Sequence, residues 1–209
     1  MHLVGVVLEG RRDFAAGALE YTLEVGNGRG PTQDPPQIVI DANASKAVNL
    51  ALKLEPDALP GLEIGGAYYL DHVPENLDPT KGPVHTAFDE TIGNVFVVWR
   101  RGGWQIFGEF FAIEHSQGND AESTGWYAEV SRRFGDWTPY ARADTVEIDD
   151  GDSYFTSVDD LATVGLGLRF DLSTWNALKL ELDRTEVDAG PGGSDETRTA
   201  LRIQTAFSF

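Results

Sequence analysis

The side chains of this sequence that could do chemistry are mainly carboxylates. Asp and Glu number 34 against 16 Lys and Arg, which gives a formal net charge of −18 at pH 7. Glu109 and Glu129 could serve as the carboxylate pair of a glycosidase if they faced one cleft about 5 to 9 Å apart. His115 adjoins Ser116, but neighbouring residues of a strand point to opposite faces, which argues against an esterase built on that pair.

No motif indicates a metal or a cofactor. The acidic run 149–153 lacks the ligand spacing and the final Glu of a calcium loop, and the glycine-rich segment 26–30 lacks the Lys-Ser/Thr ending of a phosphate-binding loop. His2, His72 and His85 have no metal-ligand spacing. The chain has no cysteine, which excludes disulfides, zinc–thiolate sites and cysteine nucleophiles. We therefore expect no metal, no cofactor and no enzymatic activity.

The acidic balance also excludes nucleic acid as a partner, since phosphate binding requires clustered Lys and Arg. The acidic runs 149–152 and 159–160 are interpreted as solvated connecting segments. The longest apolar runs, such as 95–99, are far shorter than the roughly 18 to 20 residues of a membrane-spanning helix. If the chain crosses a membrane, it must do so with strands.

The charged residues follow an alternation of period two, which places them on one face of successive strands. In 197–209, Leu201, Ile203, Phe207 and Phe209 oppose Arg198 and Arg202. In 90–100 and 104–114 the pattern does not fix the faces, and Phe96, Phe107 and Phe111 are candidates for the polar side. The charged residues expected to share this inward, polar face are Glu9, Glu20, Glu24, Lys53, Glu55, Glu63, Asp71, Glu129, Arg133, Arg142, Asp144, Arg169, Asp171, Lys179, Glu181, Asp183, Arg198 and Arg202.

The pattern predicts about eleven strands, at 1–10, 14–26, 46–55, 61–71, 90–100, 104–114, 122–134, 137–148, 162–172, 175–186 and 197–209. Most have ten residues or more, whereas strands of soluble proteins peak near 5 to 6 residues. Ten residues at about 3.3 Å each, tilted by about 40°, climb about 25 Å, the height of an outer-membrane apolar band.

The expected connections alternate in length. Short turns are predicted at 11–13, 56–60, 101–103, 135–136 and 173–174, and longer polar loops at 27–45, 72–89, 115–121, 149–161 and 187–196. Short turns at one rim and long loops at the other are typical of outer-membrane barrels. Trp99, Trp104, Trp137 and Trp175 flank the short turns and Trp126 is expected near the other rim, as interface aromatics should.

Four stretches of the sequence resemble a known group of proteins. The stretches LEYTLEVGNGRG (19–30), KAVNLALKL (46–54), LPGLEIGGAYY (59–69) and VSRRFGDWTPY (130–140) are similar to the C-terminal part of phosphate-selective-porin-like proteins. The last strand, with Leu201, Ile203, Phe207 and Phe209 on one face, resembles the signal by which outer-membrane barrels are recognised for assembly. The resemblance implies a Gram-negative outer-membrane location, contacts with lipid and lipopolysaccharide and recognition by the barrel-assembly machinery; it leaves a homotrimer open.

We therefore predict an all-β fold, an antiparallel transmembrane β-barrel of the porin type, formed by residues 1–209 as one domain. Barrels of this kind usually have an even number of strands with both termini in the periplasm, so we expect an N-terminally incomplete barrel of about 12 to 18 strands. An extra strand at 38–40 would weaken this parity argument. The N-terminus has no signal peptide, so either the signal has been removed or upstream sequence is missing.

The predicted function is passive diffusion of small hydrophilic solutes through a porin. Phosphate selectivity requires a basic constriction; the excess of acids instead favours cations or neutral solutes. One alternative is a soluble β-sandwich, such as a carbohydrate-binding module or a glycosidase. Another is a barrel that anchors or adheres and conducts nothing.

Overall fold

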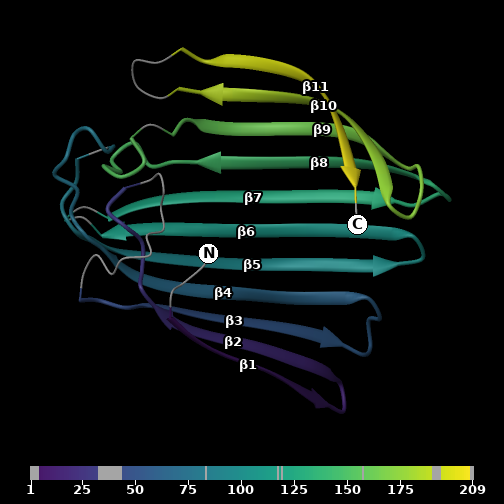
Figure 1. Cartoon of the computed structure of the whole chain (residues 1–209), viewed down its shortest axis with the longest axis horizontal. Coiled ribbons are helices and arrows are strands. Elements are labelled where there is room, and N and C mark those ends of the chain that lie inside the picture. Colours follow the sequence, from purple (N-terminus) through teal and green to yellow (C-terminus); the bar gives the residue numbers. More distant parts are fainter. Residues whose placement is uncertain are drawn as a thin grey trace.

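The computed structural model describes residues 5–32, 44–82, 84–116, 118, 120–156, 158–189 and 194–207, and the regular elements of this part are all strands. Figure 1 shows them side by side in chain order. Their bounds are β1 (Gly5–Phe14), β2 (Gly17–Gly26), β3 (Ala47–Pro56), β4 (Leu62–Val73), β5 (Phe88–Arg101), β6 (Trp104–Ser116), β7 (Asp120–Arg132), β8 (Trp137–Glu147), β9 (Asp160–Asp171), β10 (Asn176–Asp188) and β11 (Glu196–Phe207).

The eleven strands form one antiparallel sheet in which each strand pairs with its neighbours in the sequence. The predicted all-β fold and number of strands are confirmed. Within the described residues every strand belongs to this one sheet, so the β-sandwich alternative, which requires two packed sheets, is wrong. β1 and β11 are the two edges of the sheet and do not pair with each other, so the sheet is not closed.

The two faces of the sheet differ in polarity in the opposite sense to a soluble protein. On one face, Leu166 and Ile203 are 66% and 69% exposed; on the other, Glu181 and Asp183 are 5% and 1% exposed. Side chains on the inner side of a curved sheet converge and bury one another, whereas those on the outer side diverge. We call these the polar face and the apolar face; the polar face is the crowded one.

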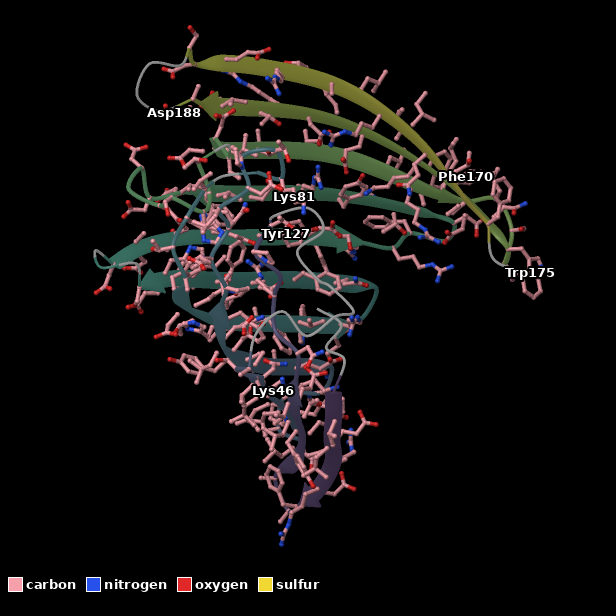
Figure 2. The ribbon with its side chains drawn as sticks, turned by 60° about the vertical axis from the view of Figure 1, so that its left-hand side comes forward. Lys46, Lys81, Tyr127, Phe170, Trp175 and Asp188 are labelled. Carbon is pink, nitrogen blue, oxygen red and sulfur yellow. The ribbon has the colours of Figure 1, made fainter. Side chains whose placement is uncertain are left out.

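The connections sort into two rims (Figure 1). Residues 15–16, 57–61, 102–103, 133–136 and 172–175 connect strands at the short-turn rim, and 27–46, 74–87, 148–159 and 189–195 at the long-loop rim. In Figure 2, Phe170 and Trp175 lie at the short-turn end and Asp188 at the opposite end. At the 102–103 turn, Gly102 and Gly103 have φ values of 61° and 82°, the left-handed conformation that a two-residue hairpin requires.

Two connections differ from the predictions. The expected turn at 11–13 is wrong, because β1 continues to Phe14 and turns at 15–16. Charged residues there suggested a turn, but Arg11 extends the alternation and pairs with Glu20 on the polar face. The expected long loop at 115–121 is also wrong: β6 and β7 reach Ser116 and Asp120, so only 117–119 connects them. β5, β7 and β9 each begin two residues earlier than predicted.

Aromatic side chains concentrate on the apolar face near the short turns. The ring of Trp137 packs on Phe170 at 4.2 Å between centroids, and the guanidinium of Arg132 lies 4.8 Å from the rings of both Trp104 and Phe134. Such a cation keeps its charge at a wet boundary while its stem covers apolar surface. Trp99 opposes Leu62 on this face, Trp175 lies exposed in a turn, and Trp126 lies in the middle of β7 rather than near the other rim.

In the described part of the chain, no helix is long and apolar enough to cross a membrane. Leu201, Ile203 and Phe207 of the predicted assembly signal share the apolar face of β11, where Leu201 opposes Leu182. Phe209, His2 and the segment 38–40 lie outside the described residues.

Candidate functional site: the polar face

The register places the predicted inward-facing charges on the polar face. Directly opposed pairs include Glu20 with Lys53, Glu129 with Arg142, Arg169 with Lys179 and Glu181 with Arg202. Arg133 follows β7 and reaches Asp171 at 3.6 Å. Glu24, Glu63, Asp144, Asp183 and Arg198 take the same parity on their strands. Because one strand sets the parity of the next, a correct register at β11 carries through the sheet.

A first ion network crosses β1 to β5 toward the short-turn rim. Arg11 lies 2.7 Å from Glu20 and 3.0 Å from Glu55. Lys53 lies 2.8 Å from Glu20, 3.0 Å from Glu55 and 3.8 Å from Glu63. Arg100 extends the network to β5 at 2.9 Å from Glu63. The hydrogen bonds and charges hold these long side chains along the wall of the sheet.

A second ion network crosses β8 to β11 and is more deeply buried. Arg142 lies 3.2 Å from Glu181 and 3.3 Å from Asp183, and Lys179 lies 3.2 Å from Glu181. Arg202 forms ion pairs with both acids. The Tyr140 hydroxyl donates a 2.5 Å hydrogen bond to Glu181. Since buried carboxylates are costly unless they are paired, the basic side chains offset the cost of burying Glu181 and Asp183 here.

Between the two networks the polar face carries aromatic rings. Phe96, Phe107 and Phe111 are half-buried on this face of β5 and β6, which fixes the side that periodicity left open. The rings of Phe96 and Phe111 lie over Gly65 and Gly125 on the adjacent strands, where a Cβ atom would collide with them. Glycine therefore lets these rings lie against the wall.

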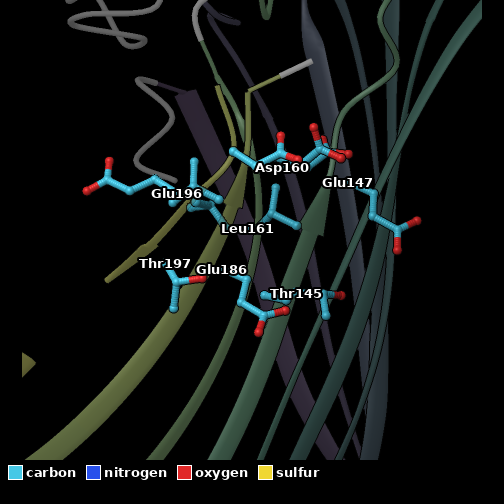
Figure 3. A pocket seen from close by; sticks show the side chains of 12 residues that line it. Thr145, Glu147, Asp160, Leu161, Glu186, Glu196 and Thr197 are labelled. Carbon is cyan, nitrogen blue, oxygen red and sulfur yellow. The ribbon is translucent and has the colours of Figure 1, made fainter. Parts of the chain in front are cut away.

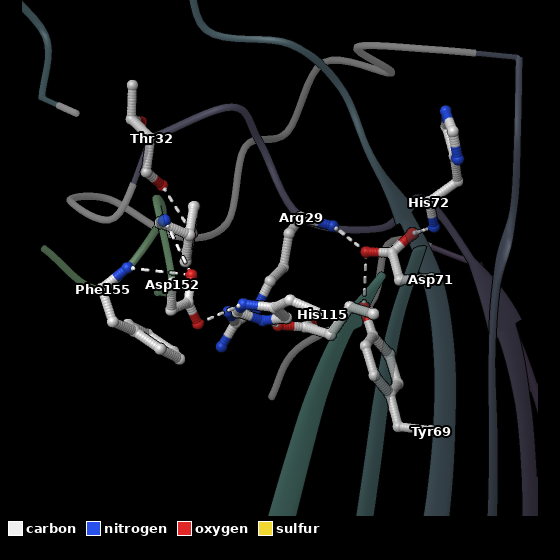
Figure 4. Close-up of polar contacts among 10 residues, drawn as sticks. Arg29, Thr32, Tyr69, Asp71, His72, His115, Asp152 and Phe155 are labelled. Atoms are coloured by element: carbon white, nitrogen blue, oxygen red, sulfur yellow. Dashed lines mark hydrogen bonds and ion pairs between the residues drawn. The ribbon is translucent and has the colours of Figure 1, made fainter. Parts of the chain in front are cut away.

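A buried polar cluster lies at the long-loop rim (Figure 4), and we call it the rim cluster. Its centre is His115 of β6, which has no exposed surface. The His115 Nε2 lies 2.9 Å from Glu90 of β5, and its Nδ1 lies 2.7 Å from Asp152 in the loop between β8 and β9. A neutral imidazole has one N–H to donate, so carboxylates on both ring nitrogens favour the imidazolium.

Arg29 attaches a second loop to the same cluster. Its guanidinium lies 2.8 Å from Glu90, and its backbone N–H donates a 2.6 Å hydrogen bond to Asp71, which also accepts from the Tyr69 hydroxyl at 2.8 Å. Phe88 and Tyr154 pack edge to face at 5.4 Å beside His115. The loops that begin at 27 and at 148 are thus both held against the polar face.

The loop carboxylate is stabilised in its ionised form. Burial alone would raise the pKa of Asp152, but the hydrogen bond with His115 and the backbone N–H groups of Tyr154 and Phe155 lower it below its usual range. Burial raises the pKa of the Tyr154 hydroxyl, which therefore stays protonated and donates to the carbonyl of Thr32 at 3.3 Å. Asp152 and Tyr154 thus have, near neutral pH, the protonation states that these hydrogen bonds require.

The sequence did not reveal the rim cluster. Asp71 was expected to face inward, but Arg29, Glu90, His115 and Asp152 were not brought together. Arg29 and Glu90 are 61 residues apart in the sequence, and His115 and Asp152 are 37 residues apart. These contacts join loops to strands, which periodicity cannot describe. The parity of β6 does place His115 on the same face as Phe111, and that is the one signal that could have found it.

An acidic hollow of about 450 Å³ lies at the long-loop ends of β8 to β11. The register gives Glu147, Asp160 and Glu186 the parity of the apolar face. Figure 3 shows Glu147, Asp160, Glu186 and Glu196 around it. Among the residues that the structure describes, no group of His, Asp and Glu is arranged to hold a metal ion. Glu109 and Glu129, the carboxylates considered for a glycosidase, share the polar face; Glu109 accepts from Asn94 and Glu129 from Tyr127, each at 2.7 Å.

Two solved porin structures are similar to this chain. The anion-selective porin from Comamonas acidovorans aligns over 97% of this chain and 58% of its own, with a TM-score of 0.66 and 10% identity. A porin refined at 1.8 Å resolution aligns over 97% of this chain and 61% of its own, with a TM-score of 0.57 and 13% identity.

No protein-family model and no curated protein matches the sequence. The likeness shows that the chain has the porin-type barrel fold, and the chain spans about three fifths of the length of these two porins. It supports a porin-like fold and does not show the phosphate-selective-porin-like group in particular.

Proposed function

We propose that the protein is an outer-membrane porin through which small hydrophilic solutes diffuse passively, and that it is not an enzyme. The observation that carries this proposal is the inverted burial: Leu166 is 66% exposed, whereas Asp183 is 1% exposed. Water would make so large an apolar surface unfavourable, whereas hydrocarbon makes it favourable. The charges on the other face then line a wet interior. The porin-type fold of the two similar structures supports the same conclusion.

The proposed interior is lined by the two ion networks and by the carboxylates between them. Charges of both signs across a lumen keep it hydrated and produce a transverse field that favours polar solutes. Arg11 and Arg100 bound the first network, and Arg142 and Arg202 supply cations to the second. Each of these four cations already has a carboxylate partner. In the described strands they therefore do not form the basic constriction that phosphate selectivity needs.

We propose a mild preference for cations and neutral solutes. The formal net charge of −18 and the acidic hollow at the long-loop rim both raise the local concentration of cations at the mouth. One similar structure is an anion-selective porin. Its selectivity belongs to that protein, because at 10% identity the charges of its lumen do not carry over to this chain.

The proposal extends to partners. The apolar face fits outer-membrane lipids, and the acidic long-loop rim fits lipopolysaccharide through bridging divalent cations. The apolar side of β11, with Leu201, Ile203 and Phe207, is the surface we assign to the barrel-assembly machinery. A homotrimer, the assembly left open by the sequence, would use part of the same apolar face.

One observation favours a second candidate, a barrel that anchors or adheres without conducting. The rim cluster holds two loops against the polar face through Arg29 and Asp152. If these loops covered the whole mouth, solutes could not pass. A measurement of ion conductance separates the two functions.

The test is ion conductance of the full-length protein in a planar bilayer, with a salt gradient to measure selectivity. The proposal expects stepwise channels with a reversal potential on the cation side. Stable insertion without conductance would support the anchoring barrel, and a reversal potential on the anion side would refute the cation preference.

A further inference from the structure

A hollow of about 440 Å³ lies on the polar face of β2 to β6, between the rim cluster and the first ion network. Its volume is within the range of about 300 to 1,000 Å³ that is usual for small-molecule sites. Its floor is apolar, from Ala67, Tyr69, Ile92 and Phe111, and its sides carry Glu24, Asn49, Asn94 and Glu109. The hollow thus combines an apolar floor with two carboxylates.

The two carboxylates differ from those of the ion networks in having amides as partners. Asn49 Nδ2 donates to Glu24 at 2.7 Å, and Asn94 Nδ2 donates to Glu109 at 2.7 Å. Asn94 is itself oriented, since its Oδ1 accepts the backbone N–H of Ala67 at 2.5 Å. Among the described residues, no Lys, Arg or His forms an ion pair with either carboxylate. An amide orients a carboxylate without supplying an opposite charge, so a cation in the hollow would find two carboxylates that no basic side chain pairs with.

We infer that this hollow binds organic ammonium ions with a short apolar body, such as linear diamines, as they pass through the pore. An ammonium group would meet Glu24 or Glu109, which belong to β2 and β6 at the two sides of the floor. The methylene chain would cover Ile92 and the ring of Phe111, and an aromatic face also attracts a cation. A neutral sugar would use the amides and the ring but would leave both charges unpaired. The chemistry therefore favours an amine over a sugar.

This inference rests on the proposed porin function but is tested first by a measurement that does not need conduction. The full-length protein in detergent is titrated with 1,5-diaminopentane at low salt, and the heat of binding is measured. The neutral 1,5-pentanediol has the same carbon chain and is the control ligand. Glucose tests whether the hollow binds a neutral sugar instead. Saturable binding of the diamine, with neither the diol nor glucose binding, is the expected result.

The variants Glu24→Gln and Glu109→Gln keep the shape of each side chain and remove its charge. Each should weaken diamine binding by about threefold, and the double variant by about tenfold, as for partly exposed ion pairs. Glu9→Gln is the matched control, because Glu9 lies on the same face of β1, opposite Thr22 and outside the hollow. It should leave diamine affinity unchanged. Equal losses in all three single variants, or tighter binding of the diol or glucose, would overturn the inference.

Planar-bilayer recordings then separate this inference from the proposed function. Channels that the diamine blocks, with block relieved in the double variant, support both. Channels without diamine binding or block would overturn the inference and leave the porin function standing. Diamine binding by a protein that forms no channels would overturn the porin function and leave the site standing.

Discussion

The Nδ1 of His115 lies 2.7 Å from the carboxylate of Asp152, so a strand of the wall holds a loop that follows 37 residues later. The same imidazole contacts Glu90, which in turn binds Arg29 from another loop. One buried side chain thereby joins two loops to the sheet at the mouth of the proposed pore. The position of the loop at 148–159 depends on this contact.

Replacing Asp152 with Asn should free that loop. Asn keeps the size of the side chain but removes the charge that pairs with His115, and a polar group buried without its partner costs about 1 to 3 kcal/mol. Because the chain has no cysteine, a spin label on Asp150→Cys reports the loop alone. We expect its spectrum to become more mobile in the Asp152→Asn background. Asp159→Asn, an equal charge change in the same loop, should leave the spectrum as it is.

The loop should resist mild acid. The pKa of Asp152 in the folded loop is below its ordinary value of about 3.9. Its contribution is therefore fully present above that ordinary value and is lost only as pH falls through the lowered pKa. The label should stay immobile from pH 7 down to about 4 and become mobile only at still lower pH. Mobilisation above pH 5 would show that a group other than Asp152 controls the loop.

The second ion network should respond with opposite shifts of selectivity to opposite charge changes. Glu181→Gln retains an acceptor for the Tyr140 hydroxyl but leaves Arg142 and Arg202 in excess, so the reversal potential should move toward anions. Arg142→Gln leaves Glu181 and Asp183 in excess and should move it toward cations. Each change should cost about 1 to 3 kcal/mol of stability. Shifts of the same sign in both variants would mean that these side chains do not face the ion path.

Close packing of Tyr140 on Gly167 should make that glycine intolerant of a methyl group. A Cβ atom at Gly167 would collide with the Tyr140 ring, whereas at Gly93 the nearest atom is the Tyr68 Cδ2 at 3.9 Å. Gly167→Ala should therefore destabilise the protein by about 1 to 3 kcal/mol and weaken the bond from Tyr140 to Glu181. The temperature at which the protein loses its compact form in detergent electrophoresis checks this. Gly93→Ala is the matched control, and an equal temperature for both variants would contradict the packing argument.

The strands and their faces were predictable because alternate side chains of a strand can be assigned to the two faces in only two ways. The charged residues select one of these two assignments. Leu201 and Arg202 fix the parity of β11, and the pairing of Arg202 with Glu181 carries it to β10. The same reasoning failed at β1, where Arg11 and Asp13 look like turn residues. Their strand conformation depends on Glu20 and Glu55 on neighbouring strands, which the local sequence does not reveal.

The rim cluster could not be predicted because its contacts are not periodic. Asp152 lies in an acidic run that suggested a solvated loop, yet its side chain is buried against His115. Only the three-dimensional path of the loop brings them together. The hollow was hidden for a related reason: Glu24 and Glu109 are far apart in the sequence, and they share a site only because β2 to β6 lie in register.

The claim that the polar face lines a water-filled pore is tested most directly by two cysteine substitutions on adjacent residues of β10. Lys179 lies on the polar face and Leu180 on the apolar face, and both are partly exposed. A membrane-impermeant thiol reagent is added to Lys179→Cys or Leu180→Cys channels in a planar bilayer. We predict a stepwise fall in conductance for Lys179→Cys and none for Leu180→Cys. Modification of Leu180→Cys but not Lys179→Cys, or an equal effect on both, would contradict the account.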